Sequence, residues 1–326
     1  VTLGENNTTV TLSTTVDIIL SAANSITNNE AVTAGGSVSM NSTGTITNNA
    51  NVSAASAITM NAGTAIDNST GGDITISSSG GNITLTAGTS IINDAVTATN
   101  GAISMDTSNG SGSIENTGAV TAGTTLTEKA KTTLTNSAAV KAATGITMEA
   151  GNSISNGSTV EATGGSIGMT ATNNGITNTG AVTATGESSS VSMSATNTSA
   201  GAIQNDANVT AGNGITMTAG TTIDNSNNSL LVSSAKGGIS LTAGTSITND
   251  AVTASAGSVS MTANKGNITN NGALQALGTS STVNLTAKDS SAGAITNNAN
   301  VTAGNANVTA GNGITMTADT AIDNSN

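Results

Sequence analysis

The chain has 326 residues, a net charge of −12, and no Phe, Tyr, Trp, His, Cys or Pro. Six basic residues, all lysines, against eighteen acidic ones exclude a basic surface for nucleic acid, and no apolar run approaches the roughly 18 residues of a membrane-spanning helix. Without His, Cys or Arg, the usual residues of acid–base catalysis and thiolate metal sites are missing.

Residues 1–20 alternate apolar and polar side chains in three short stretches, Val1-Thr-Leu3, Val10-Thr-Leu12 and Val16-Asp-Ile18. This period of two is typical of strands. The motif that marks every later repeat is missing here. We therefore predict that residues 1–20 form an irregular first coil or continue an upstream part of a longer protein.

From residue 21 onward, a motif of Ile (once Leu), any residue and Asn returns every 20 to 27 residues without losing phase. A fixed period in this range predicts a repeat architecture in which each unit covers its neighbour. The asparagines of the motif are Asn28, Asn48, Asn68, Asn93, Asn116, Asn136, Asn156, Asn178, Asn205, Asn225, Asn249, Asn270, Asn297 and Asn324.

Two further columns lie between successive Ile-x-Asn motifs. The first is a valine column, as at Val52. Two coils are ambiguous, because the position would be filled there by Ile74 or Ile76, and by one of the residues from Leu230 to Val232. The second has Ile or Val, a polar residue, and then Met or Leu; all nine methionines, including Met316, fall at its third position. Three apolar–polar–apolar segments per period indicate three short strands, and no stretch has helical spacing.

The predicted fold is therefore all-β: a right-handed parallel β-helix (β-solenoid) of about 14 coils, each with 20–27 residues and three short strands. Right-handed coiling follows from the handedness of parallel crossover connections. We expect residues 21–326 to form a single solenoid domain that is open at both ends. Open ends expose unpaired strand edges, so the predicted partners are further copies of the chain or the rest of a longer one.

The asparagine column has a structural explanation and a functional one. An amide carries both a donor and an acceptor, so stacked copies can hydrogen-bond from coil to coil and satisfy one another inside the core. The alternative is a row of ligand-binding amides. A binding site would not need fourteen copies, and we therefore predict a structural ladder.

Glu128 is the exception in the methionine column, because alignment with its neighbours places this acid at a methionine position. A buried carboxylate is costly unless it is paired. We expect a local shift that turns Glu128 outward, near Lys129 or Lys131. The alternative is an internal site for an ion or a partner.

Extra residues in the long coils fall at corners rich in Ser, Gly, Thr and Asn, which are typical of loops. These loops are the surfaces that differ most between coils, and so the places where recognition is expected. They are the segments 67–82, 183–190, 197–201, 278–282 and 287–293.

The sequence predicts no enzyme, no cofactor and no metal site. Acidic residues are scattered, and no carboxylate pair is accompanied by the basic or aromatic residues of polysaccharide-cleaving enzymes. Asn-Asp pairs at 93–94, 205–206 and 249–250 suit turns better than a cation. Thr84/Thr86 and Thr216/Thr218 fit an ice-binding face, but residues such as Asp106 and Glu149 interrupt that column, which leaves ice binding a distant alternative.

Coils of about 20 residues with Ile-x-Asn, Val-Thr-Ala-Gly and Gly-x-Ile-x-Met/Leu phrases resemble the filamentous-haemagglutinin type of repeat, over residues 21–326. That family comprises large bacterial exoproteins of two-partner secretion, including adhesins and contact-dependent inhibition stalks. The resemblance implies an extracellular or cell-surface location and a structural role as a stiff stalk or self-assembling filament. The alternative is an adhesin whose corner loops bind a glycan or a surface protein. Neither reading involves nucleic acid or membrane insertion.

Overall fold

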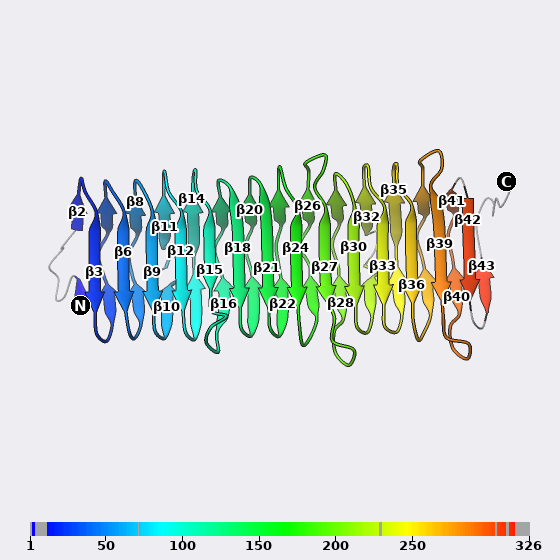
Figure 1. Cartoon of the computed structure of the whole chain (residues 1–326), viewed down its shortest axis with the longest axis horizontal. Helices are drawn as coiled ribbons and strands as arrows, with labels where there is room; N and C mark the ends of the chain where they lie inside the picture. The colour runs from blue at the N-terminus through cyan, green and yellow to red at the C-terminus, as the bar shows by residue number, and fades with distance from the viewer. Residues whose placement is uncertain are drawn as a thin grey trace. The chain divides into compact units, whose positions relative to one another are not determined.

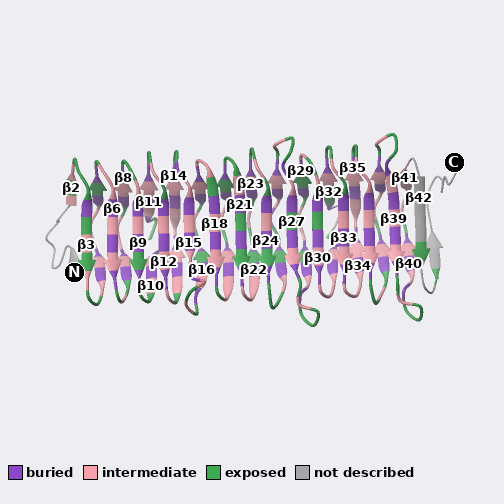
Figure 2. Ribbon diagram, in the orientation of Figure 1, coloured by how far each residue is buried: buried purple, intermediate pink, exposed green. Residues whose placement is uncertain are grey.

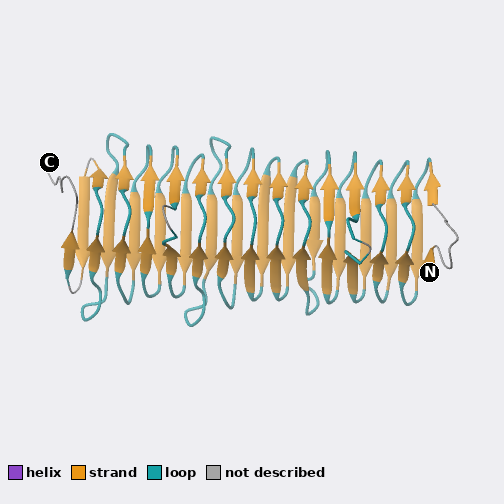
Figure 3. Ribbon diagram, turned by 180° about the vertical axis from the view of Figure 1, so that it is seen from behind, coloured by secondary structure: helices purple, strands orange, loops and turns teal. Residues whose placement is uncertain are grey.

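A computed structural model describes residues 2–3, 12–70, 72–227, 230–303, 305–310 and 313–316. All regular structure within these ranges is β-strand (Figure 3). None of the described residues forms a helix that could span a membrane. The chain divides into two compact units, Val1–Gly151 and Asn152–Asn326.

In each unit the strands fall into three parallel sheets, and successive strands of the chain go to the three sheets in turn. We name them the asparagine, valine and methionine sheets after their columns. In Figure 1 the near strands of the methionine sheet, such as β3 (Ile18–Ala22), run downward, the far strands run upward, and the coils advance to the right. The coiling is therefore right-handed, as predicted.

The strands of the first unit are as follows. The asparagine sheet contains β1 (Thr2–Leu3), β4 (Ile26–Asn28), β7 (Ile46–Asn48), β10 (Ala65–Asn68), β13 (Ser90–Asn93), β16 (Ser113–Asn116) and β19 (Thr133–Asn136). The valine sheet contains β2 (Leu12–Thr14), β5 (Val32–Ala34), β8 (Val52–Ala54), β11 (Thr75–Ser78), β14 (Ala95–Ala98), β17 (Val120–Ala122) and β20 (Val140–Ala142). The methionine sheet contains β3, β6 (Val38–Ser42), β9 (Ile58–Ala62), β12 (Ile83–Ala87), β15 (Ile103–Asp106), β18 (Thr125–Ala130) and β21 (Gly145–Ala150).

The second unit repeats this arrangement. Its asparagine sheet contains β22 (Ser153–Asn156), β25 (Ile176–Asn178), β28 (Ile203–Asn205), β31 (Ile223–Asn225), β34 (Ile247–Asn249), β37 (Ile268–Asn270), β40 (Ile295–Asn297) and β43 (Ile314–Met316). Its valine sheet contains β23 (Val160–Ala162), β26 (Val182–Ala184), β29 (Val209–Ala211), β32 (Leu231–Ser234), β35 (Ala251–Ala254), β38 (Leu274–Ala276) and β41 (Val301–Ala303). Its methionine sheet contains β24 (Ile167–Ala171), β27 (Val191–Ala195), β30 (Ile215–Ala219), β33 (Ile239–Ala243), β36 (Val259–Ala263), β39 (Thr282–Ala287) and β42 (Asn305–Ala310).

The pairing register keeps each column in line, so that like residues stack. Ile26 pairs with Ile46 and Asn28 with Asn48, for example. Apolar side chains at alternate positions point inward and form the core, while the residues between them stay partly exposed (Figure 2). The core consists of Ile, Val, Leu, Met and Ala side chains, as a chain without Phe, Tyr or Trp requires.

The register also resolves the two ambiguous coils. Ile76 pairs with Val52 and Val96, so it occupies the valine column. Val232 does so in the second unit, where it pairs with Val209 and Val252.

The assignment of Met316 to the methionine column is wrong for the described backbone, because Met316 pairs with Asn297 in the asparagine sheet. The place opposite Leu285 in the methionine sheet is taken by Val308. Asn324, the last predicted member of the asparagine column, lies outside the described residues.

The described part of residues 1–20 also joins the three sheets. Thr2 pairs with Thr27, Leu12 with Val32, and Ile18 with Val38. Leu3 takes the place of the motif asparagine, opposite Asn28. Parallel pairing therefore extends into this segment although the Ile-x-Asn motif does not.

Candidate functional site

The structure offers four features to consider: the asparagine ladder, buried Glu128, the corner loops, and two surface grooves. The ladder comes first because it contains the predicted site residues. All its described asparagines from Asn28 to Asn297 are buried, with at most 1% of their surface exposed. Each closes a short strand two residues after an inward-facing Ile or Leu, so the strand pleat turns its amide into the core.

In the first unit the ladder runs from Asn48 to Asn136. The Nδ2 of each asparagine donates to the Oδ1 of the next, at 2.7 Å for Asn48 to Asn68, 2.7 Å for Asn68 to Asn93, 2.9 Å for Asn93 to Asn116, and 2.6 Å for Asn116 to Asn136. Every donor points toward the C-terminal side. The predicted hydrogen bonds between stacked asparagines are confirmed in this run.

The second unit contains two such runs. One joins Asn156 to Asn178 and Asn178 to Asn205, each at 2.7 Å. The other leads from Asn225 through Asn249 and Asn270 to Asn297, at 3.3, 3.3 and 2.7 Å.

The ladder is interrupted within both units. Asn205 turns its Nδ2 to the carbonyl oxygen of Ala207 at 2.8 Å, and the Oδ1 of Asn225 has no partner. In the first unit, the Nδ2 of Asn28 and the Oδ1 of Asn48 are both buried and unpaired. The predicted hydrogen bond between stacked asparagines is therefore missing at these two steps, and a buried amide is left with an unsatisfied polar atom at each.

Glu128 lies inside the core, and the predicted outward turn is wrong. In β18 it pairs with Met105 and Met148, and none of its surface is exposed. Its Oε1 accepts from the Nδ2 of Asn116 at 2.7 Å and its Oε2 from the Nδ2 of Asn136 at 3.1 Å. The register overrides the charge, because an outward turn would shift every neighbouring side chain of the strand to the other face.

Burial raises the pKa of Glu128 to about 7, although the hydrogen bonds from Asn136 and Asn116 act in the opposite direction. No described lysine shares the interior with it. The adjacent Lys129 points outward and forms an ion pair with Glu149 at 3.3 Å. Glu128 is thus a solitary buried acid clamped by two ladder amides. Enclosed in this way, it cannot reach a substrate.

The described residues contain no group of three or more acidic residues close enough to hold a metal ion. The Asn-Asp corners instead brace the turns. Asp94 accepts from the backbone N–H of Ile74 at 3.1 Å and from Thr117 Oγ1 at 2.8 Å. Asp250 accepts from the backbone N–H of Leu230 at 3.4 Å. These contacts are coil-to-coil bonds, which fits the turn-forming role predicted for the pairs.

Several of the predicted corner loops are held by their own hydrogen bonds, and the longer ones leave the stack at its corners (Figure 3). Asp289 accepts from the backbone N–H groups of Ser291 and Ala292, and the hydrogen bonds from Ser291 lead in lowering its pKa. Asn197 forms the equivalent turn in its own loop, accepting from the backbone of Ser199 and Ala200. These loops therefore present fixed, polar surfaces.

Loop 183–190 is tied to the coil two turns further along the chain, past the intervening β29. Glu187 forms an ion pair with Lys236 at 2.8 Å, and that hydrogen bond and the lysine charge lower the pKa of Glu187. In loop 67–82, partial burial raises the pKa of Asp67, but hydrogen bonds from Ser69 and Thr70 lower it overall. With a lowered pKa, Asp67 and Glu187 both stay ionised at neutral pH.

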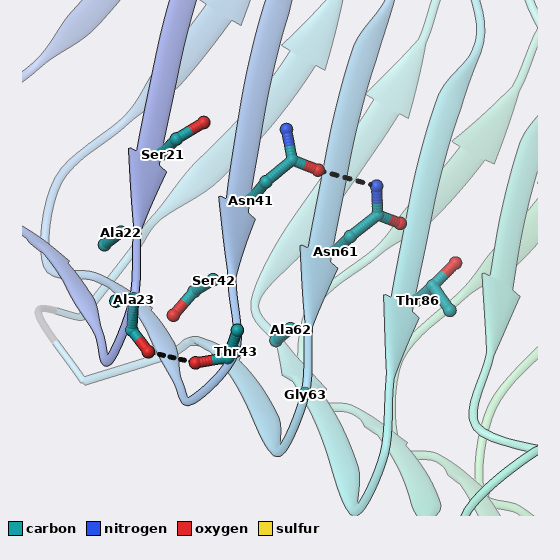
Figure 4. A pocket seen from close by; sticks show the side chains of 10 residues that line it. All are labelled: Ser21, Ala22, Ala23, Asn41, Ser42, Thr43, Asn61, Ala62, Gly63 and Thr86. Atoms are coloured by element: carbon teal, nitrogen blue, oxygen red, sulfur yellow. Dashed lines mark hydrogen bonds between the residues drawn. The ribbon is translucent and has the colours of Figure 1, made fainter.

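A shallow groove of about 500 Å³ lies on the outer surface of the first unit, where β3, β6, β9 and β12 end (Figure 4). It is concave because Ala22, Ala62 and Gly63 leave space between coils. Asn61 donates to the Oδ1 of Asn41 at 2.9 Å across its floor, and Thr43 donates to the carbonyl oxygen of Ala23. No acid or base lines the groove, so it offers polar contacts but no catalytic group.

A second groove of about 370 Å³ follows the valine sheet of the same unit and is lined by Ser, Thr and Ala alone, including Ser53, Ser77 and Thr99. It has the same origin in small residues.

Comparison of the chain with protein-family models, with curated proteins and with solved structures gives no match. The coil geometry itself is that of a β-solenoid repeat region.

Proposed function

We propose that this chain is a structural segment of a bacterial cell-surface or extracellular fibre, comparable to the repeat regions of filamentous-haemagglutinin-type exoproteins. The observation that carries the proposal is the use of the same three parallel sheets by every described coil. In such a stack, each coil is hydrogen-bonded to the coils before and after it, and extension along the stack must break several ladder bonds together.

The chemistry of the surface supports a mechanical role. Charged residues are few, no described cluster suits a metal, and the grooves contain only amides, hydroxyls and small apolar groups. A stalk or filament needs no reactive group. It needs coils that add to one another, and the aligned columns supply them.

Single-molecule extension of the full chain, tethered at its two ends, tests this proposal. We expect high resistance followed by stepwise release of coils, together with resistance of the folded chain to protease. Extension at low force in one smooth event would refute a load-bearing role. Electron microscopy of the native material would distinguish isolated stalks from continuous filaments.

Adhesion through the corner loops is a second candidate, favoured by the internal hydrogen bonds that fix loops 197–201 and 287–293. A fixed loop loses less conformational entropy on binding. A glycan and surface-protein binding screen tests it. Saturable binding that disappears when loops 183–190 and 287–293 are shortened would favour an adhesin over a passive stalk.

Ice binding is a third candidate, supported by the outer face of the methionine sheet in the second unit. The outward positions from β27 to β36 carry only hydroxyls, namely Ser192, Ser194, Thr216, Thr218, Ser240, Thr242, Ser260 and Thr262. The charges that break this column, Asp106, Lys129 and Glu149, all belong to the first unit. Thermal hysteresis in the unaltered chain that is lost in Thr218→Lys would favour ice binding. An unaltered chain without thermal hysteresis would eliminate this candidate.

A further inference from the structure

Four asparagines at coil corners share one local structure: Asn51, Asn82, Asn208 and Asn267. Each is exposed and directly precedes a strand. Each is followed by an inward Val or Ile and then by an outward Ser or Thr, as in Asn82-Ile83-Thr84. The strand pleat thus creates the pattern Asn-x-Ser/Thr, which is the acceptor pattern of N-linked glycosylation.

The hydrogen bonding of these four side chains leaves the acceptor atom available. The Oδ1 of each accepts a backbone N–H from the next coil: Thr75 at 2.8 Å, Ala102 at 2.9 Å, Leu231 at 2.9 Å and Ala294 at 2.9 Å. Besides this contact, none of the four side chains donates a hydrogen bond from its Nδ2 to another described residue. The amide oxygen of each residue is therefore held by the next coil, while the side-chain nitrogen of an exposed residue keeps no such bond.

Among the other asparagines that share the acceptor pattern, two are buried. Asn68, in Asn68-Ser69-Thr70, and Asn156, in Asn156-Gly157-Ser158, belong to the ladder. Their Nδ2 atoms donate to Asn93 and to Asn178. A sugar on either nitrogen would have to occupy the filled core, so the folded chain excludes modification there.

We propose that Asn51, Asn82, Asn208 and Asn267 are acceptor sites for N-linked glycosylation. The donor is a sugar activated as a diphosphate ester, either on a nucleoside or on a lipid, and it is transferred by a glycosyltransferase. The Nδ2 nitrogen forms a bond to the anomeric carbon, the bond from that carbon to the diphosphate oxygen breaks with its electron pair leaving on the diphosphate, and the amide releases one proton.

This inference rests on the proposed extracellular location. Glycosylation would give the corners the role of keeping neighbouring fibres apart, because the chain carries few charges that could do so. A hydrated sugar at a corner blocks close lateral approach, and it leaves the Oδ1 contact to the next coil intact.

The test is glycopeptide mass mapping of the full chain isolated from the cells that produce it. We expect sugar on the four corner asparagines and none on Asn68 or Asn156. A single hexose would indicate a nucleotide-activated donor, and a defined oligosaccharide would indicate a lipid-linked one. Unmodified corner asparagines, or equal occupancy of Asn68 and Asn156, would overturn the proposal.

Matched variants separate modification from folding at Asn82. Thr84→Ala should abolish sugar on Asn82 and keep its bond to Ala102, whereas Thr84→Ser should retain the sugar. Asn82→Asp keeps the acceptor oxygen but removes the nitrogen, so it should fold normally and carry no sugar at this site. Sugar retained in Thr84→Ala would also overturn the proposal. A sugar-free chain that still forms load-bearing fibres would refute this inference and leave the structural role standing.

Discussion

Replacing Glu128 with methionine should stabilise the first unit at alkaline pH. Glu128 occupies a methionine position between Met105 and Met148, and its pKa is raised from 4.5 to about 7 by burial. Each pKa unit corresponds to about 1.36 kcal/mol, so the folded state is disfavoured by about 3 kcal/mol once the carboxylate is ionised in both states. Glu128→Met removes that cost and restores the apolar column.

The sign of the pH dependence follows from the raised pKa. Below about pH 4.5 the group is protonated in the folded and the unfolded chain, and it contributes no difference. As the pH rises from 4.5 to about 7, the unfolded chain releases its proton first and stability falls. Above about pH 7 the loss is complete. Stability of the unaltered chain should therefore decline across this window relative to Glu128→Met.

Urea unfolding of both chains between pH 4 and pH 8 measures this difference. Comparing the chains at each pH cancels carboxylates whose pKa is lowered, such as Asp67, since these groups favour the folded state as the pH rises. Glu128→Gln serves as the control, because it removes the ionisation but keeps the shape and one acceptor oxygen. A difference between Glu128→Met and the unaltered chain that does not grow from pH 4 to pH 8 would refute the reasoning.

Three further changes probe the corners, the ladder and the surface. Gly244→Ala places a Cβ 1.8 Å from the carbonyl oxygen of Gly220 and should lower the unfolding free energy by about 1–3 kcal/mol in urea titrations. Gly168→Ala is the matched control, because no atom lies within 4 Å of its Cβ. Its unfolding free energy should lie within about 0.5 kcal/mol of the parent value. Asn93→Ala leaves the Nδ2 of Asn68 and the Oδ1 of Asn116 buried and without their ladder partner. Each unpaired group should lower the unfolding free energy by about 1–3 kcal/mol. Calorimetry that shows no loss of stability would argue against the ladder as a stabilising element. Lys236→Ala should raise the pKa of Glu187 toward its ordinary value without a measurable fall in melting temperature, which NMR titration and thermal unfolding check together.

Much of this fold could be predicted from the sequence because one period governs it. Strands of two to six residues, most with inward positions at i and i+2, recur in every described coil. The columns alone were insufficient where two apolar residues compete, as at Ile74 and Ile76, which are both buried. There the choice depends on pairing with Val52 and Val96, which only the three-dimensional register reveals.

Glu128 shows how a local argument can fail. The cost of burying a carboxylate favoured an outward turn, but Leu126 and Ala130 flank it in the same strand and both are buried. Turning Glu128 outward would turn these two neighbours outward as well. The ladder amides of Asn116 and Asn136 also reduce the cost of burial, and their approach to the carboxylate cannot be read from the sequence.

Function is best sought where the two units differ, because their interiors use the same three columns. On the outer face of the methionine sheet, the first unit pairs Asp106 with Lys129 and Lys129 with Glu149, so that opposite charges alternate from coil to coil. The second unit has an uncharged hydroxyl face at the corresponding positions. Charges directly opposite one another across strands favour one alignment of otherwise similar coils, since a slipped register would lose the attraction or bring like charges together. The first unit therefore carries charges on this face that favour one register, whereas the second unit has uncharged side chains at the corresponding positions. Exchanging Lys129 for threonine would remove the alternation of opposite charges without touching the core.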